Sequence, residues 1–264
     1  MDKLTVKISI VITTKNRFHL LKRALKSVLR QTYTNIEVVV VDDCSDFNIA
    51  SYLESLNKNI IFYRFNNSVG ANACRNKGAS LSTGDYIAYL DDDDEWLPNK
   101  LTHQLNTIIN ERAEFCYTAK NVLYSKDDKI YKKRYNYSKP RFDNLKISIS
   151  TANFIGTTSS IFLSKKLFED VGGFNERMPA LQDYEFFIRI INKGYKVIGI
   201  SIPLINYYEF SDKKNISGNF KRNILSSYYL MKINLFKRYS MILLLSVLKI
   251  FLVKNLKMIL SFLK

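Results

Sequence analysis

The chain has 264 residues, of which 47% are hydrophobic, enough to fill the core of one large α/β domain or of a domain with an appendage. Its three cysteines, Cys44, Cys74 and Cys116, form an odd and sparse set without metal-ligand spacing, which argues against a disulfide framework and a zinc site. The N-terminal residues lack the basic, apolar and cleavage regions of a signal peptide. These features favour an ordered protein of the reducing cytoplasm.

The net charge of +16 is unevenly distributed along the chain. Residues 1–100 contain 13 basic and 12 acidic residues, residues 101–200 contain 16 and 10, and residues 201–264 contain 11 and 2. A nucleic-acid-binding domain would carry basic residues on a folded face, interleaved with aromatics, whereas here the excess lies toward a very apolar C-terminal segment. The distribution therefore predicts no nucleic-acid partner and indicates an anionic membrane surface instead.

Short β-branched runs alternate with amphipathic stretches in the first 110 residues. The predicted strands are 6–13, 36–41, 60–65 and 86–90, and the predicted helices are 18–31, 47–56, 70–82 and 98–110, the last opened by Pro98. Strict alternation of strand and helix implies right-handed crossovers. We therefore expect an α/β fold with a mainly parallel sheet flanked by helices.

After Thr118 the pattern is less regular. Residues 120–146 are charged and rich in tyrosine, which predicts a long loop or small hairpin over a site, or else a solvated surface insertion. Order returns with the stretch TTSSIFLS at 157–164, a short helix within 165–174, a helical pattern in 179–195 and a final strand-like run at 196–203. The sequence GGF at 172–174 is typical of a helix stop, with Phe174 packing inward.

Two of the predicted strands end in aspartates. IEVVVVDDCS carries Asp42 and Asp43, and YIAYLDDDDEW carries Asp91 to Asp94. The carboxyl edge of an open parallel sheet is where ligands bind, so Asp42 and Asp43 are candidates to hydrogen-bond a base or ribose. A single aspartate after a strand also serves as a turn former or helix cap, and this alternative stays open for both residues.

Four consecutive aspartates repel one another unless a cation offsets their charge. Asp91 and Asp93 are two residues apart, so in an extended chain they face the same way and can present oxygens to one dication. Oxygen ligands without a nearby histidine or cysteine select Mg²⁺ or Mn²⁺ over zinc. Because substrate phosphates typically complete such a metal's coordination, the run predicts a site for a metal diphosphate.

Five segments occur in a fixed order along the chain: ISIVITTKNR, SVLRQTYTNIEVVVVDDCS, GANACRNKGASLSTGDYIAYLDDDDEW, GTTSSIFLSKKLFEDVGGFNE and LQDYEFFIRI. Together they resemble the inverting family 2 glycosyltransferases over residues 6–212. The resemblance implies a GT-A-type nucleotide-diphospho-sugar transferase fold in residues 1–212. Within it, residues 1–119 would bind the nucleotide-sugar, and residues 120–212 would supply the acceptor site and the catalytic base.

The resemblance also implies roles for single residues of the nucleotide pocket. Thr13 and either Asp42 or Asp43 would lie in the pocket around a uracil, so the donor would be a UDP-sugar. Arg75 would be the basic residue near the nucleotide or diphosphate.

The family's acidic motif falls on the aspartate run. Asp91 would lie toward the ribose and contribute to the metal site, and Asp93 would hold the Mn²⁺ or Mg²⁺. The run of four leaves the register of Asp92 and Asp94 open, with Asp92 a further candidate contact of the nucleotide. Members often carry a histidine after the last strand, but here that segment has none, so Glu209, Asp212 or water would supply a third ligand.

Asp183 matches the catalytic-base position of the family. From the local sequence alone, it is also explained as an acid of the first helical turn, stabilised by the helix dipole. Many members have Glu-Asp where this chain has Gln182 and Asp183, which keeps the base and changes its neighbour. Glu185 is expected to be solvated or ion-paired, and Trp96 to form either a wall of the acceptor site or part of the core.

Residues 240–264 are apolar but are interrupted by Lys249, Lys254 and Lys257. On a helix these lysines and the serines of the segment fall within one arc of about 180°, opposite the large apolar side chains. Such a helix fits in-plane binding to anionic lipid better than a membrane span, with an interface to a partner or to further copies of the chain as the alternative. We therefore expect residues 213–264 to form a basic amphipathic helical segment that holds the protein peripherally at the inner face of the plasma membrane.

A sugar transferase at that location implies a glycan or lipid-linked acceptor, as in bacterial-type surface polysaccharide synthesis. Two other functions stay open on the sequence. One is a non-catalytic nucleotide-sugar-binding scaffold of the same fold, against which the intact acids argue. The other is a glycoside hydrolase with paired carboxylates, which would need neither nucleotide nor metal.

Overall fold

The computed structural model describes residues 6–56, 59–126, 129–210, 226 and 230. The elements of its first half are β1 (Ile8–Thr14), α1 (Phe18–Leu29), β2 (Ile36–Asp42), α2 (Ala50–Ser55), β3 (Ile60–Arg64), α3 (Ala71–Leu81), β4 (Tyr86–Asp91), β5 (Glu95–Trp96) and α4 (Lys100–Glu111). The elements of its second half are β6 (Phe115–Lys126), β7 (Lys129–Asn136), α5 (Leu145–Thr151), the 3-10 turn η1 (Thr158–Ser160), β8 (Ile161–Ser164), α6 (Lys165–Asp170), α7 (Gln182–Lys193) and β9 (Val197–Phe210). The predicted strands and helices of the first 110 residues are all present, with ends shifted by a few residues.

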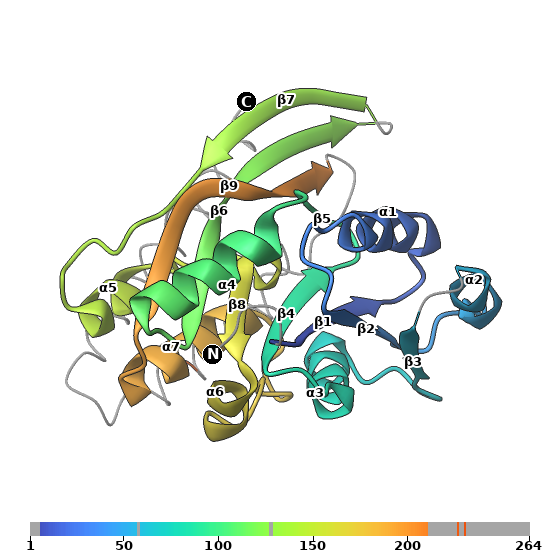
Figure 1. The fold of residues 1–264 in the computed structure, drawn as a ribbon, viewed down its shortest axis with the longest axis horizontal. Coiled ribbons are helices and arrows are strands. Elements are labelled where there is room, and N and C mark those ends of the chain that lie inside the picture. The colour runs from blue at the N-terminus through green and yellow to red at the C-terminus, as the bar shows by residue number, and fades with distance from the viewer. Residues whose placement is uncertain (1–5, 57–58, 127–128, 211–225, 227–229, 231–264) are drawn as a thin grey trace, which may run out of the picture.

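The strands of the described residues join one sheet, in the order β3-β2-β1-β4-β8-β6-β9-β5, with β7 paired to β6 (Figure 1). Strands β3, β2, β1 and β4 are mutually parallel, and so are β6 and β9. Strand β8 lies between these two parallel groups and pairs antiparallel with β4 on one side and β6 on the other. The prediction of an α/β fold with a mainly parallel sheet flanked by helices is confirmed.

The sheet is covered on both faces, which explains why its central strands are continuous β-branched runs. Side chains of β1 alternate between two cores: Val11 packs into one, and Ile10 and Ile12 pack into the other. The first core also contains side chains of α3, α5, α6 and α7, and the second contains side chains of α1, α2 and α4. Trp96 is 3% exposed and belongs to the second core, so the core alternative for this residue was correct and the acceptor wall was wrong.

The irregular region after Thr118 contains a hairpin, β6–β7, which confirms the hairpin alternative, and residues 130–135 of its second strand are exposed to solvent. Strand β6 pairs with β8 near its start, with β7 near its end, and with β9 along most of its length. Strand β9 is longer than the predicted 196–203 because it continues to Phe210 along β6. In Figure 1 the hairpin and the end of β9 extend past the helices at the top of the view.

Two glycines allow close approaches that position the site. A Cβ on Gly78 would lie 2.3 Å from Val11 Cγ1, so its absence lets α3 pack directly on β1. Gly173 has φ +65°, and a Cβ there would lie 2.7 Å from Asn76 Oδ1. The same Asn76 oxygen accepts a 2.8 Å hydrogen bond from the backbone N–H of Phe174, which is 2% exposed. The predicted helix stop with an inward Phe174 is confirmed.

Lys100 is a fully buried lysine at the start of α4. Its Nζ donates to Gln104 Oε1 at 2.5 Å and lies 4.0 Å from the centre of the Trp96 ring. None of the described carboxylates forms an ion pair with it. Burial lowers the pKa of Lys100 to about 7, because the ammonium loses its hydration.

This lowered pKa predicts a dependence of stability on pH. Between the folded pKa of about 7 and the ordinary value of 10.5, the unfolded chain binds more protons at Lys100 than the folded protein. The free energy of unfolding therefore rises with pH across this window, by about 1.4 kcal/mol per unit at most. Lys100→Met should remove this contribution, as measured by urea unfolding at several pH values. Exposed Lys166→Met is the control, and parallel curves for wild type and Lys100→Met would contradict the prediction.

The predicted amphipathic helix at 240–264 and the proposed boundary after residue 212 lie outside the described residues. Across the ranges given above, none of the helices is long and apolar enough to cross a membrane.

Candidate active site

A cavity of about 630 Å³ opens at the carboxyl ends of β1 and β4, between the N-termini of α3 and α7. Its wall includes seven of the residues predicted from the sequence: Thr13, Asp43, Arg75, Asp91, Asp92, Asp93 and Asp183. Side chains from positions 13 to 183 thus meet at one place, because parallel strands end at the same edge of the sheet.

Asp42 differs from its neighbour and does not line the cavity. It is fully buried, its Oδ1 accepts from the backbone N–H of Ser45 at 3.1 Å, and its Oδ2 lies 3.6 Å from Arg64 Nε. Its carboxylate closes the turn after β2, which is the turn-forming alternative. The prediction that Asp42 contacts the nucleotide is therefore wrong. Asp43 lines the cavity and stays the candidate for that contact.

Asp43 orders the loop that precedes α3. Its carboxylate accepts from Ser68 Oγ at 2.8 Å, from the Val69 N–H at 2.6 Å, and from the Gly70 N–H at 3.1 Å. Gly70 has φ +92°, a conformation that glycine adopts without strain. The side chain thus fixes the backbone at one wall of the cavity.

Two arginines supply the positive charge that the aspartate run requires. Arg75 of α3 donates to Asp91 Oδ1 at 2.7 Å. Arg17, just before α1, donates from one nitrogen to Asp92 Oδ1 at 3.1 Å and to Asp93 Oδ2 at 2.9 Å. The repulsion that the sequence implies is therefore offset within the protein by two guanidinium groups.

The remaining contacts of the run fix its backbone and its buried members. Asp92 Oδ2 accepts from Thr14 Oγ1 at 2.8 Å, and the Asp93 carbonyl accepts from Arg23 at 2.6 Å. Burial and the nearby Asp93 raise the pKa of Asp92 to about 6, although Arg17 and Thr14 oppose the shift. Burial also raises the pKa of Asp94 well above its usual range, and the neighbouring carboxylates add to this.

Asp183 lies in the first turn of α7. This helix begins directly after Leu181, which has a left-handed φ of 54°. Its Oδ1 accepts from the Tyr184 N–H at 2.8 Å. Burial raises the pKa of Asp183, while the Tyr184 N–H and the Arg75 charge oppose the increase. A carboxylate whose pKa is moved toward neutrality, and which borders the cavity, is suited to accept a proton from a bound hydroxyl.

The helix that carries Asp183 is anchored by a second acid, Glu185. This side chain is 1% exposed and forms two hydrogen bonds with Arg189, at 2.7 and 2.8 Å. Arg189 also donates to the Gly173 carbonyl at 2.6 Å, which ties α7 to the turn after α6. Of the two predicted alternatives for Glu185, solvated or ion-paired, the ion-paired one is confirmed. The side chain is also buried.

The turn η1 also holds Asp91 in place. Ser159 Oγ accepts from the Asp91 N–H at 3.1 Å, and Thr158 Oγ1 donates to Asp91 Oδ2 at 3.3 Å. Trp96 Nε1 donates to the Ser159 carbonyl at 3.0 Å, and Gln104 Nε2 donates to the Ser160 carbonyl at 2.9 Å. Buried Trp96 and Gln104 thus hold the turn that positions Asp91.

Several residues of the site were missed by sequence reasoning. The group contains Thr14, Arg17, Arg23, Lys120, Thr158, Ser159, Tyr207 and Tyr208. Arg17 had a signal, since it ends the quoted segment ISIVITTKNR and a cation near four aspartates is expected on charge grounds. Thr14, Thr158 and Ser159 lie within the segments ISIVITTKNR and GTTSSIFLSKKLFEDVGGFNE, whereas no local pattern marks Arg23, Lys120, Tyr207 and Tyr208.

The residues at the cavity fit a hard dication in donor chemistry, although the protein supplies few ligands. The side chains of Asp91 and Asp93 are 28% and 29% exposed, respectively, and both border the cavity. Among the described residues, no three histidines, cysteines or acids come together as a metal site. Glu209 does not line the cavity, and Asp212 lies outside the described residues. Oxygens from a bound diphosphate or from water would have to complete the coordination.

Comparison with known proteins gives three findings. Residues 9–172 match the family model described as glycosyl transferase family 2. The chain is 34% identical to the putative colanic acid biosynthesis glycosyl transferase WcaA of Escherichia coli K12, over 81% of this chain and 78% of that protein. It is 27% identical to UDP-Glc:alpha-D-GlcNAc-diphosphoundecaprenol beta-1,3-glucosyltransferase WfaP of E. coli, over 86% and 87% of the two chains.

A solved structure supports the fold. S. aureus TarS residues 1–349 in complex with UDP-GlcNAc superposes with a TM-score of 0.68 at 17% sequence identity, covering 85% of this chain and 66% of that one. A second crystal structure of TarS residues 1–349 gives a TM-score of 0.63 and is covered over 64% of its length. At this identity the likeness concerns the fold, and it agrees with the GT-A-type architecture expected from the sequence.

Proposed function

This chain belongs to glycosyl transferase family 2, and from that membership we propose that it transfers a sugar from a UDP-sugar to a glycan or lipid-linked acceptor in bacterial-type surface polysaccharide synthesis. The observation that carries the proposal is the convergence of Asp43, Arg75, Asp91, Asp93 and Asp183 on one cavity. The named activity of WfaP and the UDP-GlcNAc complex of TarS support UDP as the nucleotide.

The proposed reaction is an inverting displacement at the anomeric carbon. The acceptor hydroxyl attacks from the face opposite the departing UDP, the bond to the acceptor oxygen forms, and the bond to the diphosphate oxygen breaks. Asp183 accepts the proton of the attacking hydroxyl as the new bond forms. Its raised pKa supports this role because a stronger base takes the proton more readily, while the Arg75 charge favours the ionised form.

Negative charge that develops on the leaving diphosphate requires fixed positive charge. Arg75 and Arg17 border the cavity and are held by Asp91 and by the Asp92–Asp93 pair, so both guanidinium groups are positioned before the donor binds. Asp93 and Asp91 would hold Mn²⁺ or Mg²⁺. When bound, such an ion acts as a Lewis acid on the diphosphate oxygens.

We also propose a separate role for each of three parts of the chain. Residues 1–119 supply the nucleotide-sugar site, residues 120–212 supply Asp183 and the acceptor side, and residues 213–264 associate with the inner face of the membrane. The amphipathic pattern and the charge of the last segment support its role.

Donor turnover in the absence of an added acceptor tests this function, because water can replace the acceptor hydroxyl. UDP-Glc, UDP-GlcNAc and UDP-Gal would each be incubated with the protein and Mn²⁺, and the released sugar followed by proton NMR before mutarotation. We expect slow UDP release from at least one α-linked donor, with the β anomer as the first product. Retention of the α configuration, or no UDP release from any donor, would contradict the proposal.

A further inference from the structure

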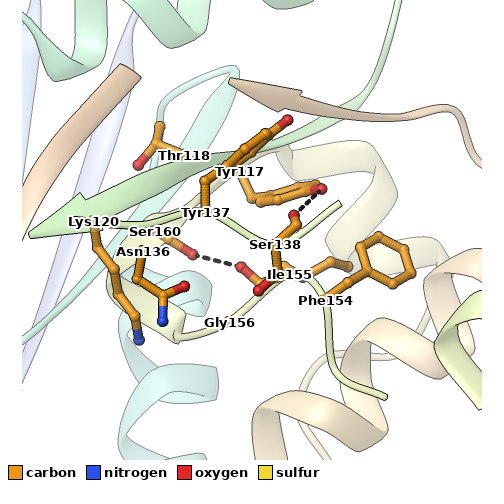
Figure 2. Close-up of a pocket in the computed structure, with 10 residues that line it drawn as sticks. All are labelled: Tyr117, Thr118, Lys120, Asn136, Tyr137, Ser138, Phe154, Ile155, Gly156 and Ser160. Carbon is orange, nitrogen blue, oxygen red and sulfur yellow. Dashed lines mark hydrogen bonds between the residues drawn. The ribbon is translucent and has the colours of Figure 1, made fainter. Parts of the chain in front are cut away.

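The hairpin β6–β7 carries a row of cations on a single face. Lys120 of β6 is directly opposite Asn136 of β7, and the next two pairs on that face are Val122 with Arg134 and Tyr124 with Lys132. Opposed side chains of an antiparallel pair lie on the same face, and every second residue returns to it. Figure 2 shows this directly for the first pair, since the side chains of Lys120 and Asn136 extend side by side in the same direction.

The row begins at the edge of the active-site cavity. Lys120 Nζ lies 4.0 Å from the centre of the Tyr207 ring, and Tyr207 lines the active-site cavity. Burial lowers the pKa of Lys120, and the carboxylates of Asp94, Asp183 and Glu209 oppose that decrease. The charge of Lys120 is thus offset by acids at the inner end of the row.

The next two cations carry charge that nothing described offsets. Arg134 and Lys132 are exposed, and no ion pair links either of them to a carboxylate of the described ranges. Glu209 of β9 is on the same face and pairs with Tyr124 of β6, which pairs on its other side with Lys132 of β7. Strand β6 therefore lies between Glu209 and Lys132. Two strand spacings, about 9.5 Å, therefore separate the backbones of Glu209 and Lys132. The outer part of the row is a net positive strip with tyrosine beside it, since Lys132 Nζ lies 5.5 Å from the Tyr124 ring centre.

We propose that Arg134 and Lys132 bind the phosphate of an anionic acceptor whose hydroxyl lies at Asp183. The inference rests on the proposed transferase function and specifies its acceptor as a sugar linked to phosphate or diphosphate. Positions two apart on a strand are separated by about 7 Å, so the two cations lie one and two such steps outward from Lys120. That arrangement suits an acceptor that extends from its reacting hydroxyl, across a sugar, to its phosphates. A guanidinium binds phosphate with two parallel hydrogen bonds, which fits Arg134 as the inner contact.

Lys133 is the matched control. It lies between the two proposed residues in the sequence and is also exposed, but it faces the opposite side of the hairpin, opposite Leu123. Lys133→Gln removes the same charge from the same strand. General electrostatic attraction would therefore respond to this variant as it responds to Lys132→Gln.

The test is titration of geranyl diphosphate into protein saturated with UDP and Mg²⁺, so that the donor cavity is filled, with geraniol as the uncharged probe. For Lys132→Gln/Arg134→Gln we expect an affinity for geranyl diphosphate lower by about tenfold or more, since charge-assisted hydrogen bonds are lost. Lys133→Gln should stay within twofold of wild type, and geraniol should not distinguish the proteins. The UDP titration that precedes each run reports on the proposed function separately, because the row lies outside the donor cavity.

Three results would overturn the inference. These are absence of geranyl diphosphate binding to the wild type, equal affinity of wild type and double variant, and equal loss in Lys133→Gln. Sedimentation with vesicles of phosphatidylglycerol and phosphatidylcholine is the second measurement. If the double substitution removed vesicle binding and left geranyl diphosphate affinity unchanged, the row would be a membrane contact and the acceptor role would be wrong.

Discussion

Asp183→Asn is expected to lower kcat for sugar transfer by about 10²–10⁴-fold, the usual contribution of a general base, while UDP affinity stays within twofold. The amide has nearly the same shape as the carboxylate, and its oxygen can still accept from the Tyr184 N–H, so the start of α7 should be unchanged. What the variant loses is a group that can take the proton of the attacking hydroxyl. The kinetic constants for UDP release and a calorimetric titration of UDP measure the two effects separately.

The matched control is Asp170→Asn, which removes an exposed carboxylate that pairs with Lys193 at 2.8 Å and does not line the cavity. It should leave kcat within twofold. If Asp183→Asn kept most of the activity, or lost UDP binding in proportion to its activity, the residue would be a structural first-turn acid, and the base would have to be sought elsewhere.

Arg75→Met is expected to affect both stability and catalysis. The guanidinium is 9% exposed and pairs with Asp91 at 2.7 Å, and because the side chain of Asp91 is 28% exposed, loss of this partner should cost about 1–3 kcal/mol of unfolding free energy. The Arg75 charge also opposes the increase in the pKa of Asp183. Its loss should therefore raise that pKa further and move the acidic limb of the pH–rate profile to higher pH.

Two measurements check this variant: urea unfolding with and without UDP, and kcat/KM between about pH 5 and 9. Arg75→Lys is the matched control, because it keeps the charge and loses the planar fork. It should restore the position of the acidic limb, because the positive charge near Asp183 is kept. If the limb were identical in wild type and Arg75→Met, the electrostatic link between Arg75 and Asp183 would be wrong.

The sequence allowed the first half of the fold to be predicted because its periodicities are strong and local. Runs such as IEVVVV are both β-branched and flanked by amphipathic helices, and they became β1 to β4 with little change in their ends. The second half was less predictable, since β6 and β7 combine tyrosine, lysine and asparagine without a regular apolar pattern, and β9 continues past its predicted end through Asn206, Tyr207 and Tyr208. These strands are specified by pairing with one another, and pairing partners distant in the chain leave no local pattern.

In the candidate site, too, some residues could be predicted from the sequence and others could not. Aspartates at the ends of strands could be located from the sequence, because the carboxyl edge of a parallel sheet gathers them. The choice between Asp42 and Asp43 could not be made, since it depends on which carboxylate closes the turn to Ser45 and which reaches the loop before α3. The contacts of Arg17 with Asp92 and Asp93 join positions 75 and 76 residues apart, and they follow from the fold alone.

The central claim is that this cavity binds UDP together with a dication, and calorimetry tests it most directly. UDP, GDP and CDP would each be titrated into the wild type and into Asp93→Ala, with and without Mn²⁺. The account predicts that UDP binds more tightly than the other two nucleotides, that Mn²⁺ strengthens binding, and that Asp93→Ala removes the effect of Mn²⁺. Absence of binding by all three nucleotides in every condition would contradict the account and favour a hydrolase.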